Sequence, residues 1–220
     1  MSCPCISGPD FLKNIFLYAF NEYAFKNIDF MILTETWLKN SDYINIKDYI
    51  CINNYLRENI KSGGVAIYKN SNNNNNTYTT TENIINSKSM SGIADICITK
   101  INFRNTYYIL VIGIYISPNT KIKYIKNFMY KKLKNIDKGM PLLLCGDFNI
   151  NLQKKENHEF IDFMKENFGL NLISKIEEST TIKKSCIDLF FTRYLTINLK
   201  YCISYFTYHK PIFGLIKFDE

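Results

Sequence analysis

The chain has 220 residues, of which 46% are hydrophobic, 15% aromatic and 21% charged. This length and composition favour one globular domain with a large core and exclude an intrinsically disordered chain. The 27 basic and 20 acidic side chains give a net charge of +7, which favours anionic partners such as nucleic acid, although an AT-rich coding sequence explains the same abundance of lysine equally well.

Most of the seven cysteines lie inside apolar runs such as Ile96-Cys97-Ile98. Their odd number and this placement favour buried thiols in a reducing compartment over a disulfide framework. Cys3 and Cys5 form a close pair without a matching Cys or His pair downstream, so the sequence does not indicate a zinc site. No apolar run approaches the roughly 18 residues that span a bilayer, and the N-terminus has no secretory pattern. We therefore expect an intracellular chain, nuclear or cytoplasmic, with no membrane partner.

The first half of the chain predicts one helix and short strands. Apolar residues at helical spacing predict a helix over 11–25, with Asp10 as its cap. The apolar run over 30–33 is typical of a strand buried on both faces, and it ends in a polar Thr-Glu-Thr. Two glycines open the segment 63–68, which predicts a turn leading into a strand. The asparagine-rich segment 70–81 has little to bury and predicts a mobile loop.

The second half of the chain predicts two helices among several strands. Helical spacing of apolar residues predicts a helix from Ile122 to Leu133, and its lysines indicate a solvated face rather than a phosphate-binding groove. A second helix is predicted over 156–168. Strands are predicted over 93–98, 107–116 and 141–145, and then in CIDLFF (186–191), KYCISYF (200–206) and PIFGLIKF (211–218).

Helices and strands alternate at first, and strands dominate later, which indicates an α/β protein with mixed sheets covered by helices. A four-layer α/β sandwich of two mixed β-sheets flanked by helices fits this order. Periodicity alone does not distinguish this sandwich from other α/β folds. No internal repeat or linker divides the sequence, so we expect a single domain over 1–220.

Polar side chains stand where several of these strands end or begin. Glu35 follows the first strand, Asp147 and Asn149 follow the strand over 141–145, and Asp188 directly precedes the apolar LFF of CIDLFF. Taken singly, each residue is typical of a surface, cap or turn position. Taken together, carboxylates at strand ends favour a site, and hard oxygen ligands on a basic chain indicate Mg²⁺ and a phosphate substrate.

Six blocks of the sequence stand out when they are read in order. They are DFMILTETWL (29–38), GGVAIY (63–68), IGIYISPN (112–119), LLLCGDFNINL (142–152), SCIDLFFT (185–192) and YHKPI (208–212). Together they resemble the endonuclease/exonuclease/phosphatase family, and most of all the endonuclease domain that precedes the reverse transcriptase in non-LTR retrotransposons. The resemblance covers nearly the whole chain.

The resemblance implies a metal-dependent phosphodiesterase, a DNA endonuclease that nicks DNA by hydrolysis with Mg²⁺ or Mn²⁺ as cofactor. Glu35 matches the metal-binding glutamate of the family. Asp147 matches the aspartate that orients or deprotonates the attacking water, and Asn149 matches the asparagine that holds the phosphate. A reverse transcriptase outside this chain is an implied partner, besides DNA.

The remaining matches concern the histidine and the substrate. His209 matches the catalytic histidine and Asp188 the aspartate that pairs with it, which favours the imidazolium form. Tyr115 matches a tyrosine that donates a hydrogen bond near the scissile phosphate, and Thr180 corresponds to a substrate-facing threonine. The other histidine, His158, is predicted to lie on a helix surface without a role.

The sequence departs from the family pattern at two places. Tyr208 stands where the family has an aspartate that contributes to the metal site. The segment 5–9 lacks the family's first-strand asparagine, as if the first strand were truncated. These departures leave two alternatives open, namely a catalytically impaired relic that binds nucleic acid or has a structural role, and a phosphatase that acts on a small phosphorylated molecule.

Overall fold

The computed structural model describes residues 28–38, 45–57, 62–72, 78–85, 92–103, 107–203 and 207–217. The helix predicted over 11–25, the Cys3 and Cys5 pair and the segment 5–9 lie outside these residues. In chain order the elements are β1 (Phe30–Thr34), β2 (Tyr49–Tyr55), β3 (Val65–Asn70), β4 (Tyr78–Ile85), β5 (Ala94–Phe103), β6 (Tyr107–Ile116), α2 (Ile122–Leu133), β7 (Leu142–Asp147), the 3-10 turn η2 (Lys155–Asn157), α3 (Glu159–Phe168), β8 (Asn171–Leu172), β9 (Asp188–Arg193), β10 (Thr196–Tyr201) and β11 (Ile212–Lys217).

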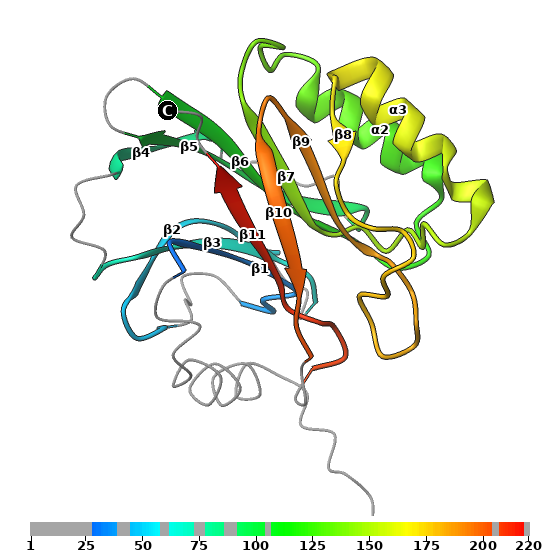
Figure 1. Ribbon diagram of the computed structural model, residues 1–220, viewed down its shortest axis with the longest axis horizontal. Coiled ribbons are helices and arrows are strands. Elements are labelled where there is room, and N and C mark those ends of the chain that lie inside the picture. The colour runs from blue at the N-terminus through cyan, green and yellow to red at the C-terminus, as the bar shows by residue number, and fades with distance from the viewer. Residues whose placement is uncertain are drawn as a thin grey trace, which may run out of the picture.

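The described strands form a six-stranded sheet in the order β4-β5-β6-β7-β9-β8, a three-stranded sheet in the order β1-β3-β2, and a β10–β11 pair (Figure 1). Within the six-stranded sheet β6 and β7 are parallel, and α2 forms the crossover between them. The other described pairings in all three sheets are antiparallel. The predicted α/β class and the packing of two sheets are therefore confirmed, with the mixed pairing confined to the larger sheet.

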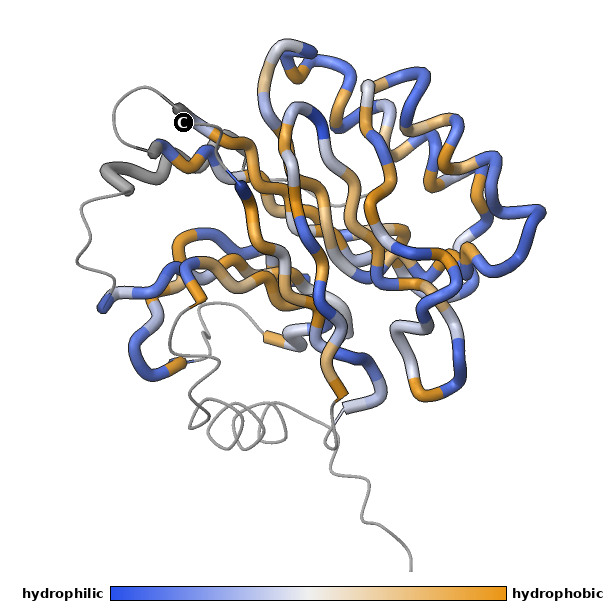
Figure 2. Tube along the Cα trace, in the orientation of Figure 1, coloured by the Kyte–Doolittle hydropathy of each residue, from blue (hydrophilic) through white to orange (hydrophobic). Residues whose placement is uncertain are grey.

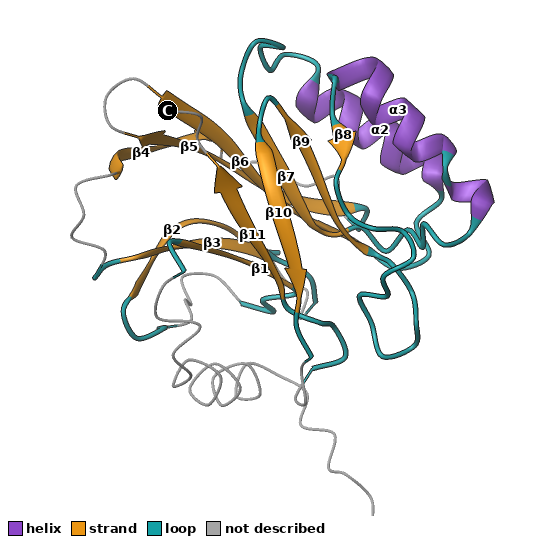
Figure 3. Ribbon diagram, viewed as in Figure 1, coloured by secondary structure: helices purple, strands orange, loops and turns teal. Residues whose placement is uncertain are grey.

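Helices α2 and α3 cover one face of the six-stranded sheet (Figure 3). Their apolar stripes, which include Phe128, Met129, Phe160 and Met164, pack onto the outward-facing residues of β5, β6 and β7. Figure 2 shows the same division, with hydrophobic residues along the central strands and hydrophilic ones on the outer side of the helices. None of the helices in the described ranges is long and apolar enough to cross a membrane.

The opposite face of the six-stranded sheet packs against the three-stranded sheet. Val65 and Ile67 of β3 meet Ile109, Val111 and other residues of β5 and β6 in this second core. Gly113 allows the close approach, because a Cβ atom there would lie 2.9 Å from side chains of both β1 and β3. The sandwich therefore has an apolar interior that ends where Tyr115 and the polar site begin.

Several strand boundaries differ from the sequence predictions. The mobile loop predicted over 70–81 is wrong from Tyr78 onward, because β4 begins there and pairs with β5 through the backbone. β1 is half-buried rather than buried on both faces, since it is an outer strand of its sheet. The strand predicted over 200–206 corresponds to β10, which begins earlier, at Thr196, and ends at Tyr201.

Candidate active site

Four polar side chains form a continuous row across the six-stranded sheet. In register, Asp95 of β5 lies opposite Tyr115 of β6, Tyr115 opposite Asp147 of β7, and Asp147 opposite Asp188 of β9. Residues directly opposite one another on paired strands share a face of the sheet. The pairing therefore gathers residues far apart in the sequence on the face that looks toward the second sheet.

Asp147 is the most buried acid of the row that the sequence had singled out, with 2% of its surface exposed. Its Oδ1 atom accepts the backbone N–H of Asn149 at 2.9 Å. Burial, together with the negative charges of Asp188 and Glu35, raises the pKa of Asp147 to about 7, although His209 and the Asn149 N–H act in the opposite direction. Asp147 can therefore exchange a proton near neutral pH.

His209 is held by Asp188. Its Nδ1 atom lies 3.0 Å and 2.9 Å from the two carboxylate oxygens, and its Nε2 atom lies 4.0 Å from Oδ2 of Asp147. Burial alone would lower the pKa of His209, but the hydrogen bond and charge of Asp188 and the charge of Asp147 raise it. The predicted pairing is thus present in the structure, and it favours the imidazolium.

The loop that carries His209 is fixed by backbone pairing to the segment before β9. Thr181 and His209 form an isolated antiparallel bridge, and Lys210 donates its backbone N–H to the carbonyl oxygen of Thr180 at 2.8 Å. Ile182 donates its backbone N–H to the carbonyl oxygen of Tyr208 at 3.0 Å. His209 is therefore oriented from both sides, by its loop and by its carboxylate partner.

Thr180 corrects one sequence prediction. The residue was expected to face substrate, but it is fully buried. Its Oγ1 atom accepts the backbone N–H groups of Ile187 and Asp188, each at 3.1 Å. Thr180 therefore positions the start of β9, and with it the Asp188 carboxylate, instead of presenting a surface to a ligand.

Asn149 braces Asp147. The side-chain amide donates to the carbonyl oxygen of Ile116 at 2.7 Å and to Oδ2 of Asp147 at 3.2 Å. Its backbone has φ of 49°, a left-handed conformation that asparagine tolerates better than most residues. Gly146, just before Asp147, is required sterically, because a Cβ atom would lie 1.9 Å from the carbonyl oxygen of Ile114. The expected contact of Asn149 with phosphate stays a prediction.

Glu35, which follows β1 in the three-stranded sheet, contacts Tyr115 of the row. The Tyr115 hydroxyl donates a hydrogen bond of 2.6 Å to Oε1 of Glu35. Burial first, and then Glu35 itself, raises the pKa of Tyr115, so the phenol keeps its proton and remains a donor. Glu35 is half-buried and has φ of 53°, an uncommon conformation that places it just beyond the end of β1.

The donor set suits a divalent cation. Asp147, Asp188 and His209 each have an atom within 4.8 Å of the others. The two carboxylates are ligands in their ionised form, whereas His209 is one only when it is neutral. Like charges in a buried position are unfavourable, as the raised pKa of Asp147 records, and a cation bound by carboxylate oxygens would relieve that repulsion. Glu35 adds a fourth charged group whose field reaches both Asp147 and His209.

Tyr208 is a neighbour of this cluster that supplies no carboxylate. The residue is 40% exposed, and its ring lies edge-on to the His209 ring, with 5.3 Å between centroids. Lys183 places its ammonium nitrogen 5.6 Å from the centre of the Tyr208 ring. The departure from the family aspartate therefore leaves an aromatic and cationic rim where an acid was expected.

Sequence reasoning missed two charged residues next to the site, Arg57 and Asp95. They form a buried ion pair, with 2.8 Å between Nε of Arg57 and Oδ2 of Asp95. The signal for Asp95 was present, since an acid inside the apolar run over 93–98 requires a partner once that strand is buried. No comparable signal marks Arg57.

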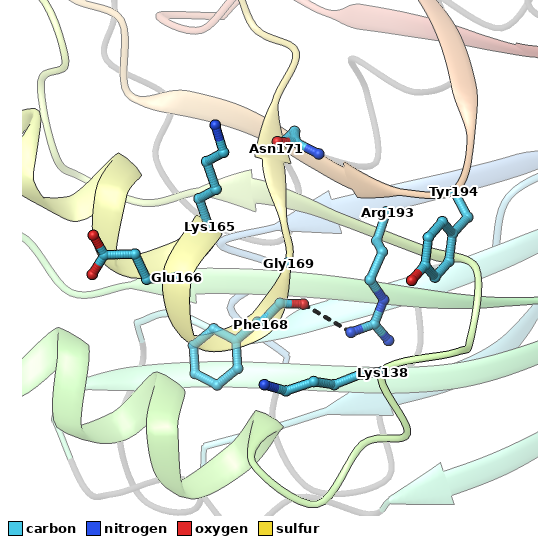
Figure 4. Close-up of a pocket in the computed structure, with 8 residues that line it drawn as sticks. All are labelled: Lys138, Lys165, Glu166, Phe168, Gly169, Asn171, Arg193 and Tyr194. Carbon is cyan, nitrogen blue, oxygen red and sulfur yellow. Dashed lines mark hydrogen bonds between the residues drawn. The ribbon is translucent and has the colours of Figure 1, made fainter.

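A shallow pocket of about 240 Å³ lies at the opposite end of the β7–β9 ladder (Figure 4). Arg193 in its lining is opposite Leu142 in the ladder and is 4% exposed. Its guanidinium donates to three carbonyl oxygens, those of Met140, Phe168 and Asp137. None of the described lining residues belongs to the candidate site, so this pocket is separate from the proposed chemistry.

No family model and no curated protein matches the sequence. Solved structures do match the fold. The endonuclease domain of TRAS1, a telomere-specific non-LTR retrotransposon, has 11% identity and a TM-score of 0.66 over 94% of this chain and 91% of that one. An endonuclease/exonuclease/phosphatase family protein from Leptotrichia buccalis has 14% identity and a TM-score of 0.68 over 97% and 96%. A mannosyl-6-phosphatase from Bacteroides thetaiotaomicron has 11% identity and a TM-score of 0.59 over 96% of both chains.

These likenesses span almost the full length of both partners in each comparison. They agree with the sandwich of two sheets, with the helices on the outer face of the larger sheet, and with the resemblance that the six sequence blocks carry. The chain therefore has the endonuclease/exonuclease/phosphatase fold.

Proposed function

We propose that the chain is a divalent-metal-dependent phosphodiesterase, a DNA endonuclease of retroelement origin that nicks DNA by hydrolysis. The observation that carries the proposal is the cluster of Asp147, Asp188 and His209, with their ligand atoms within 4.8 Å of one another at one edge of the sandwich. A neutral tyrosine donor and a further carboxylate, Tyr115 and Glu35, adjoin it. The proposed place of action is the nucleus or cytoplasm, beside a reverse transcriptase carried outside this chain.

In the proposed reaction a water oxygen forms a bond to phosphorus while the bond from phosphorus to the 3′ oxygen breaks. Asp147 takes a proton from that water, a role that suits a carboxylate with a pKa of about 7. The imidazolium of His209, oriented by Asp188, neutralises charge on the phosphoryl oxygens. The 3′ oxygen leaves with the bonding electron pair and takes a proton from solvent water. The products are a 5′ phosphate and a free 3′ hydroxyl, the group that a polymerase extends.

Glu35 would hold the cation beside the carboxylates of the cluster, and the cation would supply positive charge to the phosphoryl oxygens. Tyr115 holds Glu35 from the buried side through its hydroxyl. Asn149 keeps the Asp147 carboxylate in place through both its backbone and its side-chain N–H groups. Each of these contacts is made before substrate arrives, which is the kind of preorganisation that phosphoryl transfer needs.

DNA is the proposed substrate for two reasons. The net charge of +7 attracts polyanions, and one of the matching folds is that of a retrotransposon endonuclease domain. A phosphatase acting on a small molecule is the competing activity, because a mannosyl-6-phosphatase has a similar fold. A panel of phosphoesters assayed beside plasmid DNA separates the two.

The test is nicking of supercoiled plasmid with Mg²⁺ or Mn²⁺, and with EDTA. The chain has two histidines, which gives a matched pair of variants, His209→Ala and His158→Ala. His158 lies outside the cluster, with its Nε2 atom 2.9 Å from the carbonyl oxygen of Leu152. We expect metal-dependent nicking by the parent and by His158→Ala, and none by His209→Ala. Equal nicking by both variants would refute the proposal.

A second candidate function is a relic that binds nucleic acid without cleaving it. Tyr208 favours it, because this residue contributes an aromatic ring where a carboxylate would strengthen a cation site. This second function predicts DNA binding that weakens with salt and does not depend on metal. It also predicts no nicking under any metal condition. Turnover that EDTA abolishes would rule it out.

A further inference from the structure

The buried ion pair of Arg57 and Asp95 lies at the start of the polar row. Asp95 is fully buried, the Arg57 side chain is 9% exposed, and Nε of Arg57 lies 2.9 Å and 2.8 Å from the two carboxylate oxygens. Removing two charges from water is costly, and apolar residues of similar volume are often at least as stabilising as such a pair. Stability alone therefore does not account for the pair.

The pair contacts the tyrosine of the site. The guanidinium carbon of Arg57 lies 5.5 Å from the centre of the Tyr115 ring, and Nη2 of Arg57 donates to Oγ of Ser117 at 2.8 Å. Ser117 comes directly after β6, the strand that carries Tyr115. The guanidinium thus spans the end of this strand, against the ring whose hydroxyl donates to Glu35.

The pair is also linked to the turn that carries Glu35. Oδ2 of Asp95 accepts the backbone N–H of Gly64 at 2.8 Å, and the carbonyl oxygen of Gly63 accepts the backbone N–H of Trp37 at 2.9 Å. A Cβ atom on Gly63 would lie 2.6 Å from Arg57 and from Asp95. Because it has no side chain, Gly63 lets the 63–64 turn pack directly on the ion pair. The same turn bonds to the backbone of Trp37, two residues after Glu35.

The Glu35 turn needs such support. Glu35 and Trp37 have φ of 53° and 52°, conformations that cost free energy in residues other than glycine and persist only where the surroundings hold them. The hydrogen bonds to the 63–64 turn and to Tyr115 are among the contacts that do so, together with the packing of Leu38 in the core, and both hydrogen-bonded groups contact Arg57 or Asp95.

We infer that Arg57 and Asp95 are a positioning pair, which holds the Glu35 turn and the Tyr115 ring in one arrangement without touching substrate. The purpose of that arrangement rests on the proposed function, but its existence does not. An ion pair suits this role better than an apolar contact, because the planar guanidinium has several N–H donors in a fixed geometry and contacts Asp95, Ser117 and the Tyr115 ring at once.

The test uses the single tryptophan of the chain, Trp37, as a reporter inside the Glu35 turn. Its indole nitrogen is buried. The double variant Arg57→Met/Asp95→Leu removes both charges together, so that neither remains buried and unpaired. We expect it to fold, with far-ultraviolet circular dichroism like that of the parent, while acrylamide quenching of Trp37 rises at least about twofold as the turn opens.

Arg193→Met is the matched control, since Arg193 is the other buried arginine that the structure describes and lies at the far end of the ladder. We expect it to leave Trp37 quenching unchanged at temperatures below its melting transition. Arg57→Lys, which keeps the charge but loses the fork, should show quenching between that of the parent and that of the double variant. Parent-like quenching in the folded double variant would overturn the inference.

Activity provides the second readout. If the parent nicks DNA, the double variant should lose about a hundredfold in kcat, the cost of displacing a positioned group by about an ångström, with a smaller change in KM. If the parent is inactive, the proposed function fails while Trp37 quenching still decides the positioning role. A double variant with raised quenching but parent-like kcat would overturn the link between the pair and catalysis.

Discussion

The two ends of the β7–β9 ladder place charged groups in the interior in opposite ways. At one end Asp147 lies opposite Asp188, and the repulsion between these carboxylates contributes to a raised pKa of Asp147. At the other end Arg193 lies opposite Leu142 and donates to three carbonyl oxygens. At the Asp147 end, Asn149 and His209 offset the burial and the repulsion only in part, whereas at the Arg193 end the three carbonyl oxygens are matched by the guanidinium donors. The first end holds the candidate site and is called the functional end, and the second is called the structural end.

The largest expected effect tests the functional end. Asp147→Asn keeps the size of the side chain but removes the base and the repulsion with Asp188. We expect nicking to fall by at least about a thousandfold, with a melting temperature no lower than that of the parent, because a buried unfavourable charge is gone. Plasmid assays and thermal unfolding of the same preparation measure both. Lost stability with retained activity would reverse the comparison.

The next effect tests the structural end. Arg193→Met leaves three carbonyl oxygens without their donor, so we expect the free energy of unfolding to fall by about 3 kcal/mol. The measurement is urea unfolding followed by circular dichroism. Below the shifted transition the nicking rate should equal that of the parent, since Arg193 lies away from the Asp147 cluster. A change in kcat without loss of stability would show that this end also serves the reaction.

Tyr208 offers a way to sharpen the functional end. Tyr208→Asp adds a carboxylate beside His209, and we expect Mn²⁺ to bind about tenfold more tightly, since one further oxygen ligand and negative charge favour the cation. Titration calorimetry with Mn²⁺ gives the affinity. Tyr208→Asn, which removes the ring without adding charge, is the control. Identical affinities of the two variants would show that position 208 lies too far from the cation to act on it.

The sequence predicted the residues of the candidate site better than the residues that hold them in place. Asp147, Asp188 and His209 lie together as predicted, because each stands beside a strand or loop whose blocks keep the order that the resemblance requires. Support from distant segments carries no local pattern. The pairing of Arg57 with Asp95 joins residues 38 positions apart, and only the folded chain shows it. Thr180 misled for the same reason, since its buried partners lie in the next strand.

The strands show the same limit. Central β6 was predictable because its apolar residues are continuous and mostly β-branched, as in a strand buried on both faces. β5 was predicted only over its first half, since Thr99, Lys100 and Asn102 interrupt the apolar residues after Ile98. β2 was missed, because a bulge between Cys51 and Asn53 breaks its alternation. The buried amide of Asn53 also hides the apolar pattern, although it is satisfied by the Ile98 carbonyl oxygen at 3.0 Å. The spacing of apolar residues therefore does not predict a strand whose buried polar residue finds its hydrogen-bond partner only in the folded chain.

The smallest expected effect is the pH dependence of stability in EDTA. The pKa of Asp147 rises from 3.8 to about 7 on folding, so between these values the folded state holds a proton that the unfolded chain releases. Stability must then fall as pH rises through this window. His209 acts in the same direction, because its raised pKa adds stability that is lost as pH rises through the folded value. Between pH 5 and pH 8 we expect the melting temperature of the parent to fall by several degrees.

The two ends of the ladder should separate in this experiment. Asp147→Asn should show a flatter profile below about pH 7, because the titrating carboxyl is gone. Arg193→Met should run parallel to the parent at lower temperatures, since its bonds to carbonyl oxygens do not titrate. Adding Mn²⁺ in place of EDTA should raise the melting temperature of the parent most at pH 8, where the carboxylates are ionised and repel one another. A parent and an Asp147→Asn variant with parallel profiles would mean that the carboxylate is not the strained group that the ladder comparison requires.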